Sequence, residues 1–389
     1  MWKTYKLSDI GTVVGGATPS TTVERFYGGD IPWLTPKDLS NFQDRYIERG
    51  ERNITREGLD SCAAQLLPAN SVLFSSRAPI GYVAIAKKPI ATNQGFKSII
   101  PNEKVDSLFL YYILRYNKEK IEAMGSGTTF KEVSGAVMKN IEVALPSLEE
   151  QRRIAGILGA IDDKIENNRR INTNLELQAQ ALYKQWFVDN RKDDWEEKQL
   201  GEIALHITDG VHNTVIDSPN GEYYLLSCKN IKRGQLFIGS NERRIDQETF
   251  ARLRKRTRLS QGDILVTSVG TVGEMYLVNE IPSNYEFQRS VAIIKPNQSI
   301  ISSYFLYSAL LYLQNEIKHL AHGAVQQCIF ISDLKEYSLI VPNRSDISAF
   351  DAVVAPMFNK IGELQKENET LATLRDTLLP KLMNGEIKI

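Results

Sequence analysis

The chain has 389 residues, of which 42% are hydrophobic and 24% charged, which is enough apolar material for roughly two or three folded units and excludes a disordered chain. Its 47 Lys and Arg residues equal its 47 Asp and Glu residues. Binding to nucleic acid through a large net positive charge is therefore excluded, and any affinity for DNA has to come from local clusters of charge.

The first predicted elements form a mixed α and β region. Residues 71–86 have the pattern of two strands around a glycine-containing turn, and residues 93–100 follow as a further strand. A helix is predicted over Ser107–Met124, and a polar loop of small residues, GSGTTFKEVSG, begins at Gly125. Because loops on a rigid scaffold commonly carry recognition residues, we expect this loop to contact a ligand.

A long helix is predicted after Pro146. Ser147-Leu-Glu-Glu150 is a capping box, in which the first serine and the last glutamate satisfy backbone groups at a helix start. Mostly apolar residues then recur at three- and four-residue spacing from Ile154 to Trp186. This spacing predicts a heptad seam on a helix that reaches about Val188.

The second half of the chain repeats the first. Gly81 matches Gly273 at a spacing of 192 residues, and Pro146 matches Pro342 at a spacing of 196. The repeat predicts strands over residues 263–278 and 288–295, a helix over Ser303–Leu320, a polar loop from His322 and a second long helix after Asn343-x-x-Asp346. This small drift in spacing indicates a tandem duplication with pseudo-twofold symmetry.

The second helix reproduces the seam of the first. Adding 196 to the seam positions gives a series from Phe350 to Leu382, and both seams carry an asparagine at the same position, Asn172 and Asn368. A single seam is more often the core-facing side of one helix. Two matched seams favour an antiparallel coiled coil, in which the asparagines fix register and partner, with helices of about 40 residues and roughly 60 Å.

These elements predict an α+β protein. It consists of a tandem-duplicated pair of globular domains, each followed by a long helix, with the two helices in an antiparallel coiled coil. The expected boundaries are 1–146 for the first globular domain, 147–190 for the first spacer helix, 191–342 for the second globular domain and 343–389 for the second spacer helix.

The sequence lacks the common motifs of catalysis. It has no G-x-x-x-x-G-K-[ST] loop for nucleotide hydrolysis and no N-P-P-Y tetrapeptide of an amino-methyltransferase. Asp263 precedes Glu274-Met-Tyr276, which lacks the lysine of a D…E-x-K nuclease set. We therefore expect a chain that is not an enzyme.

Metal and membrane signals are also lacking. The three cysteines and four histidines do not have metal-ligand spacing, and the longest apolar run, Leu108–Leu114, is too short to span a bilayer. Lys3, Lys6 and Asp9 interrupt the segment where a signal peptide would need apolar residues. We expect a cytoplasmic protein without cofactor, metal site or membrane contact.

Two features of the sequence are typical of DNA-binding proteins. Between Lys229 and Arg258 there are ten Lys or Arg residues and three acids, a net charge of +7, and this segment ends in the run RLRKRTR from Arg252. Such a run can neutralise phosphates, although a solvated surface is an equally reasonable interpretation. Asn or Gln can read adenine and Arg can read guanine, and such residues occur at matching places in both copies.

The candidate DNA-binding residues of the chain are Thr18, Ser20, Thr35, Lys37, Ser75, Ser76, Arg77, Asn93, Gln94, Phe96, Thr128, Thr129, Lys131, His212, Asn213, Lys229, Asn230, Lys232, Arg233, Arg252, Arg254, Lys255, Arg256, Arg258, Ser268, Gln288, Arg289, His322, Gln326 and Gln327.

Four motifs resemble the specificity subunit of type I DNA restriction-modification systems. They are Trp33-Leu-Thr-Pro-Lys-Asp-Leu39, Ser75-Ser-Arg-Ala-Pro-Ile-Gly81, Thr92-Asn-Gln-Gly-Phe96 and Leu145-Pro-Ser-Leu-Glu-Glu-Gln-Arg-Arg-Ile154. The resemblance covers essentially the whole chain. It implies two target recognition domains that each read half of a split, asymmetric double-stranded DNA site, with the helices as a ruler.

The resemblance also implies partners. Two methyltransferase subunits and, for cleavage, translocase-nuclease restriction subunits would supply adenine methylation, S-adenosylmethionine binding and ATP use. The second copy has Tyr224 near the place of Trp33, and Val269-Gly-Thr in place of Arg77-Ala-Pro, so its base preferences are expected to differ. The rival interpretation is a stand-alone coiled-coil adaptor whose duplicated domains bind protein or ligand, which a salt-dependent DNA shift would distinguish.

Overall fold

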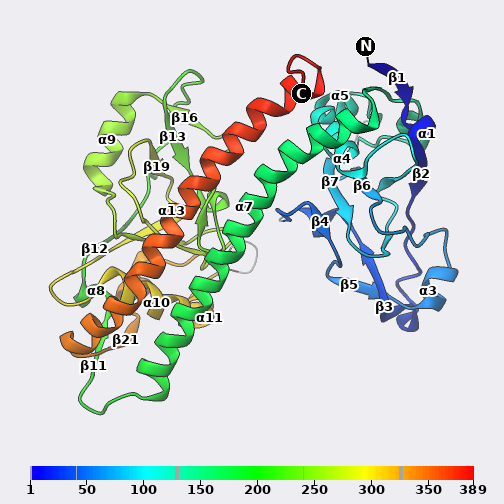
Figure 1. Ribbon diagram of the computed structural model, residues 1–389. Coiled ribbons are helices and arrows are strands. Elements are labelled where there is room, and N and C mark those ends of the chain that lie inside the picture. The colour runs from blue at the N-terminus through cyan, green and yellow to red at the C-terminus, as the bar shows by residue number, and fades with distance from the viewer. Residues whose placement is uncertain (1, 41, 128–130, 240, 324–326) are drawn as a thin grey trace. The chain divides into compact units, whose positions relative to one another are not determined.

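A computed structural model describes residues 2–40, 42–127, 131–239, 241–323 and 327–389 (Figure 1). By its contacts the chain divides into two units, one made of Met1–Asn167 with Glu367–Ile389 and the other of Asn168–Lys366. Figure 1 shows the two long helices, α7 (Leu148–Tyr183) in green and α13 (Arg344–Met383) in orange to red. Each helix contributes one segment to each unit, so both units contain residues from both repeats.

The first unit is built on a five-stranded sheet of order β2-β9-β6-β7-β4. A three-stranded sheet of order β5-β3-β8 and a two-stranded sheet of β1 and β10 complete its β-structure. The strands are β1 (Lys3–Lys6), β2 (Gly11–Gly15), β3 (Tyr27–Leu34), β4 (Tyr46–Ile47), β5 (Arg52–Ile54), β6 (Val72–Ser76), β7 (Ile80–Ala86), β8 (Ala91–Thr92), β9 (Lys97–Pro101) and β10 (Glu142–Leu145).

Short helices surround these sheets. They are α1 (Leu7–Ile10), η1 (Glu24–Phe26), α2 (Pro36–Leu39), α3 (Arg56–Asp60), α4 (Ser107–Tyr116), α5 (Lys118–Ala123) and α6 (Gly135–Asn140). The apolar face of the main sheet packs with α4 and with the segments of α7 and α13 that belong to this unit, burying Phe74, Phe109 and Leu158. The core therefore joins the main sheet to the long helices.

The second unit repeats this plan. Its sheets have the orders β12-β20-β17-β18, β16-β13-β19, β14-β15 and β11-β21. The strands are β11 (Glu196–Gln199), β12 (Ala204–Asp209), β13 (Tyr223–Leu226), β14 (Ile231–Lys232), β15 (Gln235–Leu236), β16 (Arg244–Ile245), β17 (Ile264–Thr267), β18 (Met275–Leu277), β19 (Tyr285–Phe287), β20 (Val291–Pro296) and β21 (Ser338–Val341). The helices are η2 (Lys184–Asp189), α8 (Leu200–Ile203), η3 (Cys228–Asn230), α9 (Gln247–Thr257), α10 (Ser303–Tyr312), α11 (Gln314–His319) and α12 (Ile331–Glu336).

The predicted α+β class is confirmed in both units, with four differences in detail. The predicted strand over residues 288–295 begins only at Val291. The predicted strand over residues 93–100 begins only at Lys97, because residues 93–96 form a turn closed by a hydrogen bond from the Phe96 amide to the Asn93 carbonyl. The two predicted helices are each broken once, at Asn117 and at Leu313, where the backbone leaves the helical region. The break falls at the same place in both copies.

The start of the first long helix shows the serine half of the predicted capping box, while the Glu150 side chain accepts from the Trp2 indole at 3.2 Å instead. The start of the second long helix lacks its predicted side-chain cap. The Ser147 hydroxyl accepts from the Glu150 amide at 3.3 Å. The Asn343 side chain instead donates to Asp194 at 2.8 Å, and only its carbonyl accepts from the helix. The helix α7 continues as the π-helical turn η2 to Asp189, close to the predicted end.

Within each unit the two helices pair antiparallel, as the matched seams predict. In the first unit Arg375 donates to Asp162 at 2.8 Å, and Lys164 lies 3.4 Å from Glu367. In the second unit the buried Asn172 donates to the Ile361 carbonyl at 3.5 Å. Polar groups therefore interrupt the apolar seam in both units. Asn172 makes its contact across the helix pair, as expected for a residue that fixes register.

No helix of the described residues is both long enough and apolar enough to cross a bilayer.

Candidate nucleic-acid interface

Four candidate residues of the second unit line one cavity of about 320 Å³. They come from two segments that are far apart in sequence, with His212 and Asn213 on one and Gln288 and Arg289 on the other. The segments are joined by backbone hydrogen bonds, from the Val211 amide to the Phe287 carbonyl at 2.9 Å and from the Arg289 amide to the Val211 carbonyl at 3.0 Å. The structure thus brings together polar side chains that could read a base edge.

Asp209 connects this cavity to the basic run. One of its carboxylate oxygens lies 2.6 Å from the His212 ring and the other accepts from Arg256 at 3.1 Å. Arg256 also donates to the carbonyls of Asp209 and Gly210, at 2.7 and 2.6 Å. Sequence reasoning missed Asp209, since no motif marks a single acid at the end of a strand.

The basic run lies on α9 and just beyond it, and its members have different surroundings. Arg252, Lys255 and Arg258 are exposed. The Arg254 guanidinium instead pairs with Glu286, whose carboxylate is fully buried, and donates to the carbonyls of Pro282 and Tyr285. Burial raises the pKa of Glu286, an effect that the Arg254 charge opposes. Arg254 is therefore an internal ion-pair partner, which corrects its prediction as a phosphate contact.

Further candidates lie along the segment before α9. Lys229 is exposed and pairs with Glu242 at 2.9 Å. The Arg233 side chain is exposed, and its backbone amide donates to Glu274 at 2.8 Å. Lys232 is half-buried on β14 and interacts with another group of the protein. Cations of this segment are thus partly neutralised within the unit.

The first unit has an equivalent arrangement. The Thr18 hydroxyl donates to the Gln94 side chain, and the Ala17 amide donates to the Thr92 carbonyl at 3.0 Å. The Asn93 side chain accepts from the Gly95 amide at 2.8 Å, which fixes the turn that carries Gln94. These contacts match those of Val211 with Phe287, so the same pair of segments is joined in both copies.

A glycine stands at the same place beneath both pairs of segments. A Cβ atom on Gly16 would lie 2.2 Å from the carbonyl oxygens of both Thr92 and Asn93. A Cβ atom on Gly210 would lie 2.1 Å from the Phe287 oxygen and 2.3 Å from that of Gln288. Only hydrogen fits at these positions, so both glycines permit the close approach of the two segments. Sequence reasoning missed them, although their spacing of 194 residues was a usable signal.

The remaining candidates near the start of the chain have simpler roles. Ser20 is exposed and lies 2.9 Å from the Thr22 hydroxyl. The Thr35 hydroxyl donates to Asp38 at 2.8 Å at the start of α2, and Lys37 pairs with Glu51 at 3.1 Å. Thr35 therefore acts as a helix cap, while Ser20 and Lys37 are on the surface.

The predicted recognition loops are closed in the same way in both units. Backbone hydrogen bonds join Ser126 with Glu132 at 3.0 and 2.9 Å, and His322 with Cys328 at 2.8 and 2.9 Å. Lys131 and Gln327 lie inside these closed loops and are exposed. The His322 ring stacks on Phe330 and lies 3.1 Å from Asp333. The candidates Thr128, Thr129 and Gln326 lie outside the described residues.

Five candidates are interior residues, which corrects their prediction as DNA contacts. Ser75 and Ser76 are fully buried and donate to the carbonyls of Pro79 and Gly95. The others that are buried are Phe96, Asn230 and Ser268, whose exposed fractions are 0, 2 and 3%. Their sequence motifs recur because they shape the strand ends and turns that carry the exposed residues.

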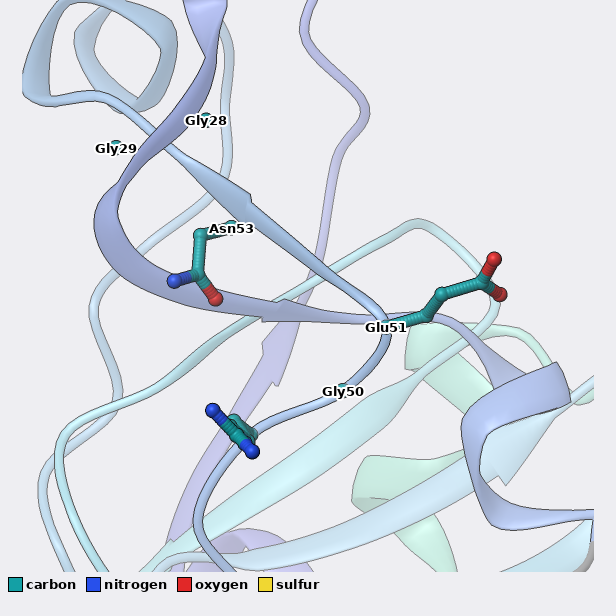
Figure 2. Close-up of a pocket in the computed structure, with 6 residues that line it drawn as sticks. Gly28, Gly29, Gly50, Glu51 and Asn53 are labelled. Carbon is teal, nitrogen blue, oxygen red and sulfur yellow. The ribbon is translucent and has the colours of Figure 1, made fainter.

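A second cavity, of about 440 Å³, lies in the first unit and was not predicted. It is lined by Gly28, Gly29, Arg49, Gly50, Glu51 and Asn53 (Figure 2). Figure 2 shows Glu51 and Asn53 directing their side chains to different sides. In the second unit Arg244 stands at the register position of Asn53 and donates to the Gly221 carbonyl at 3.1 Å. The Asn53 side chain is shorter than that of Arg244 and reaches less far from its strand.

Asp263, the aspartate of the incomplete nuclease motif, forms an ion pair inside the second unit. Lys295 pairs with Asp263 at 2.5 Å, and the Ser260 amide donates to the same carboxylate at 2.9 Å. Burial raises the pKa of Asp263, and the Lys295 charge opposes that shift. Among the described residues no group of three or more His, Cys, Asp and Glu could hold a metal ion.

Comparisons with known proteins agree with this duplicated arrangement. The family model "Type I restriction modification DNA specificity domain" matches residues 1–177 and again residues 192–366, which confirms the tandem duplication. The type I restriction enzyme MjaIX specificity subunit of Methanocaldococcus jannaschii is 36% identical over 409 aligned residues, covering 100% of this chain and 94% of that protein.

Two further proteins are similar to this chain, the first over part of its length and the second over almost all of it. The putative type I restriction enzyme MjaX specificity subunit of the same organism is 43% identical over 180 residues, covering 45% of this chain and 40% of that protein. The crystal structure of a type I restriction-modification S subunit from M. genitalium shares the fold, with a TM-score of 0.56, 19% identity and coverage of 98% and 96% of the two chains. The chain therefore belongs to the family of type I restriction-modification DNA specificity subunits, the non-catalytic members of these systems.

Proposed function

We propose that this chain reads a bipartite, asymmetric double-stranded DNA site, one half with each globular domain. Residues 1–146 and 191–342 are the two target recognition domains, and residues 147–190 and 343–389 are the spacer helices that set the distance between the half-sites. The chain acts in the cytoplasm and holds two methyltransferase subunits and restriction subunits, which supply adenine methylation and ATP-dependent cleavage.

The observation that carries this proposal is the duplicated pair of joined segments. In both copies a glycine lets two segments approach closely, and polar side chains project from them, the half-buried Thr18 with the exposed Gln94 and the exposed His212 with Arg289. Two copies of one reading platform with different side chains suit two half-sites of different sequence. Hydrogen bonds of these side chain types distinguish base pairs in the major groove.

The cations of α9 add contacts of a different kind. Arg252, Lys255 and Arg258 are exposed on the same short segment, and Arg256 connects it to the cavity through Asp209. Contacts to phosphates position a protein on the duplex without reading sequence. Replacing Arg252, Lys255 and Arg258 together by alanine should weaken binding to all sequences alike. It should also flatten the plot of log K against log salt by about 0.9 for each lost phosphate contact.

The direct test is to map methylated adenines in cells with and without the gene for this chain. The expected result is a class of methylated sites that depends on the gene and consists of two half-sites with a constant spacer. Methylation that is unaffected by the gene would refute the proposal. A purified chain that shows no salt-dependent shift of DNA, alone or with its methyltransferase partner, would favour the adaptor interpretation.

The spacer role has its own test. Both α7 and α13 pass from one unit into the other, so matched insertions of four residues after Asn167 and after Lys366 lengthen both helices together. Four residues add about 6 Å and about one helical turn, which keeps the seam facing its partner, so the spacer should grow by one or two base pairs. Unchanged half-sites with an unchanged spacer would show that the helices are not the ruler.

A two-residue insertion at the same places is the matched control. It rotates each seam by roughly half a turn and should impair assembly rather than lengthen the spacer.

A further inference from the structure

The first recognition domain contains an ion-paired cluster around Glu132, which we call the Glu132 cluster. Glu132 lies 3.4 Å from Arg77 through one carboxylate oxygen and 3.2 Å from Lys97 through the other. It also pairs through its backbone with both Arg77 and Ser126. One residue therefore joins three segments that carry candidate readers: the turn after β6, the start of β9 and the recognition loop.

The three charged side chains differ in exposure. Arg77 and Glu132 are 35 and 37% exposed, whereas Lys97 is 15% exposed. Lys97 also reaches the Gln94 carbonyl at 3.5 Å, which places it under the turn that presents Gln94. The carboxylate is thus accessible to solvent on one side and neutralises two cations on the other.

The second unit lacks this cluster at the corresponding positions. Cys328 takes the place of Glu132, since it pairs through its backbone with both Val269 and His322. Val269 stands in the place of Arg77, and Ala292 takes the register position of Lys97, opposite Asp209 on β12 as Lys97 is opposite Gly15 on β2. The backbone closure is shared by the two copies, and the charges belong to the first alone.

We propose that Glu132 is a positioning residue that gives Arg77 a single orientation and keeps Arg77 and Lys97 from binding phosphates indiscriminately. This inference rests on the proposed function and adds a specificity determinant for the first half-site. A guanidinium has five N–H donors in a fixed plane, so a carboxylate that holds one edge leaves another edge for the O6 and N7 atoms of a guanine. Without the carboxylate, both cations become free to contact any phosphate.

The proposal predicts that removing the Glu132 charge makes binding to unrelated DNA more salt-dependent and weakens discrimination for guanine at the first half-site. Glu132→Gln keeps the side-chain size and removes the charge. It should steepen the salt dependence of binding to unrelated duplexes by about 0.9 for each cation that contacts a phosphate. Between 50 and 200 mM salt, each such contact corresponds to an additional affinity change of about 3.5-fold. Discrimination for guanine at one base pair of the first half-site should fall about fivefold or more.

The measurement uses the chain in complex with its methyltransferase subunits, and fluorescence anisotropy on duplexes in which either half-site is altered one base pair at a time. Discrimination at the second half-site should remain unchanged, which a general loss of structure would not produce. Cys328→Ala is the matched control in the second unit and should leave both the salt slope and the guanine preference at wild-type values. Glu132→Asp restores the charge and should restore the wild-type slope.

Two outcomes would overturn the inference. A Glu132→Gln complex with wild-type salt slope and wild-type discrimination at both half-sites would show that the cluster has no role in reading DNA. A Glu132→Gln complex with a lower melting temperature and equal losses at both half-sites would show a structural role alone. By contrast, a wild-type complex that recognises no bipartite site would refute the proposed function itself.

Discussion

Replacing Gly16 by alanine is the most demanding test of the reading platform in the first recognition domain. Its Cβ atom would lie 2.2 Å from two carbonyl oxygens, and real Cβ atoms essentially never approach other atoms closer than 3.0 Å. The segment that carries Thr18 and the turn that carries Gln94 would therefore have to separate by about 0.8 Å or more. Both obstacles are backbone atoms, so no side-chain rotation relieves the contact.

The cost follows from this geometry. Overpacking of a well-filled site costs about 2 kcal/mol, which should lower the melting temperature of a unit of this size by roughly 4–8 °C. The displaced segments should also lose discrimination at the first half-site and keep it at the second. Gly210→Ala should do the reverse, because its Cβ atom would lie 2.1 Å from the Phe287 oxygen in the other unit.

The assay combines thermal unfolding with binding to duplexes altered in one half-site at a time. Gly156→Ala in α7 is the control for melting, since its Cβ atom would meet nothing within 4 Å. Alanine is a better helix former than glycine, so this variant should be more stable by about 0.5–1 kcal/mol. If Gly16→Ala melted like Gly156→Ala and bound both half-sites like the wild type, the platform argument would be refuted.

Three other variants probe the buried charges by urea unfolding. Arg254→Ala should lower the free energy of unfolding by about 3 kcal/mol while leaving the salt slope of DNA binding unchanged, because it leaves the buried Glu286 carboxylate without its ion-pair partner. Glu166→Gln should cost less, about 1.5 kcal/mol, since Glu166 pairs with the buried Arg45 at 2.9 Å but Arg45 keeps its second partner, Asp163; a loss below about 0.5 kcal/mol would mean the pair is not structural. Burial raises the pKa of Glu176 from 4.5 to about 7, so the folded chain favours its protonated form, and the resulting stability is present below about pH 4.5 and lost as pH rises through 7. Glu176→Gln should therefore be more stable than the wild type at pH 8 by up to about 3 kcal/mol and equal to it near pH 4.5, and equal stability at both pH values would contradict this reasoning.

The sequence by itself determined the duplication, the α+β class and the two long helices, because the signals involved are local. A spacing of 192 to 196 residues revealed the duplication, and heptad spacing marked both long helices. Strand and turn patterns placed β6, β7 and β9 of the first unit and β17, β18 and β20 of the second, whereas the other strands were not predicted. Hydrophobic periodicity reports which side of an element is buried without requiring knowledge of its partner. The matched seams even indicated the antiparallel pairing seen within each unit.

The candidate site needed the tertiary structure, because exposure and pairing depend on residues distant in sequence. The motif that contains Ser75 and Ser76 indicated the family, yet both side chains are fully buried. Arg254 and Arg252 are two residues apart in one basic run, but the first lies against a carboxylate from β19 and the second is exposed.

The contacts that join the segments of the site could not be predicted from the sequence for the same reason. Glu132 and Arg77 are separated by 55 residues, and Gly16 and Asn93 by 77, so no local pattern relates them. Folding brings each pair within a few ångströms, where a single carboxylate neutralises two cations and a missing Cβ atom lets two backbones meet. Local periodicity determines the elements of this protein, and packing between them determines which of its polar residues face the solvent.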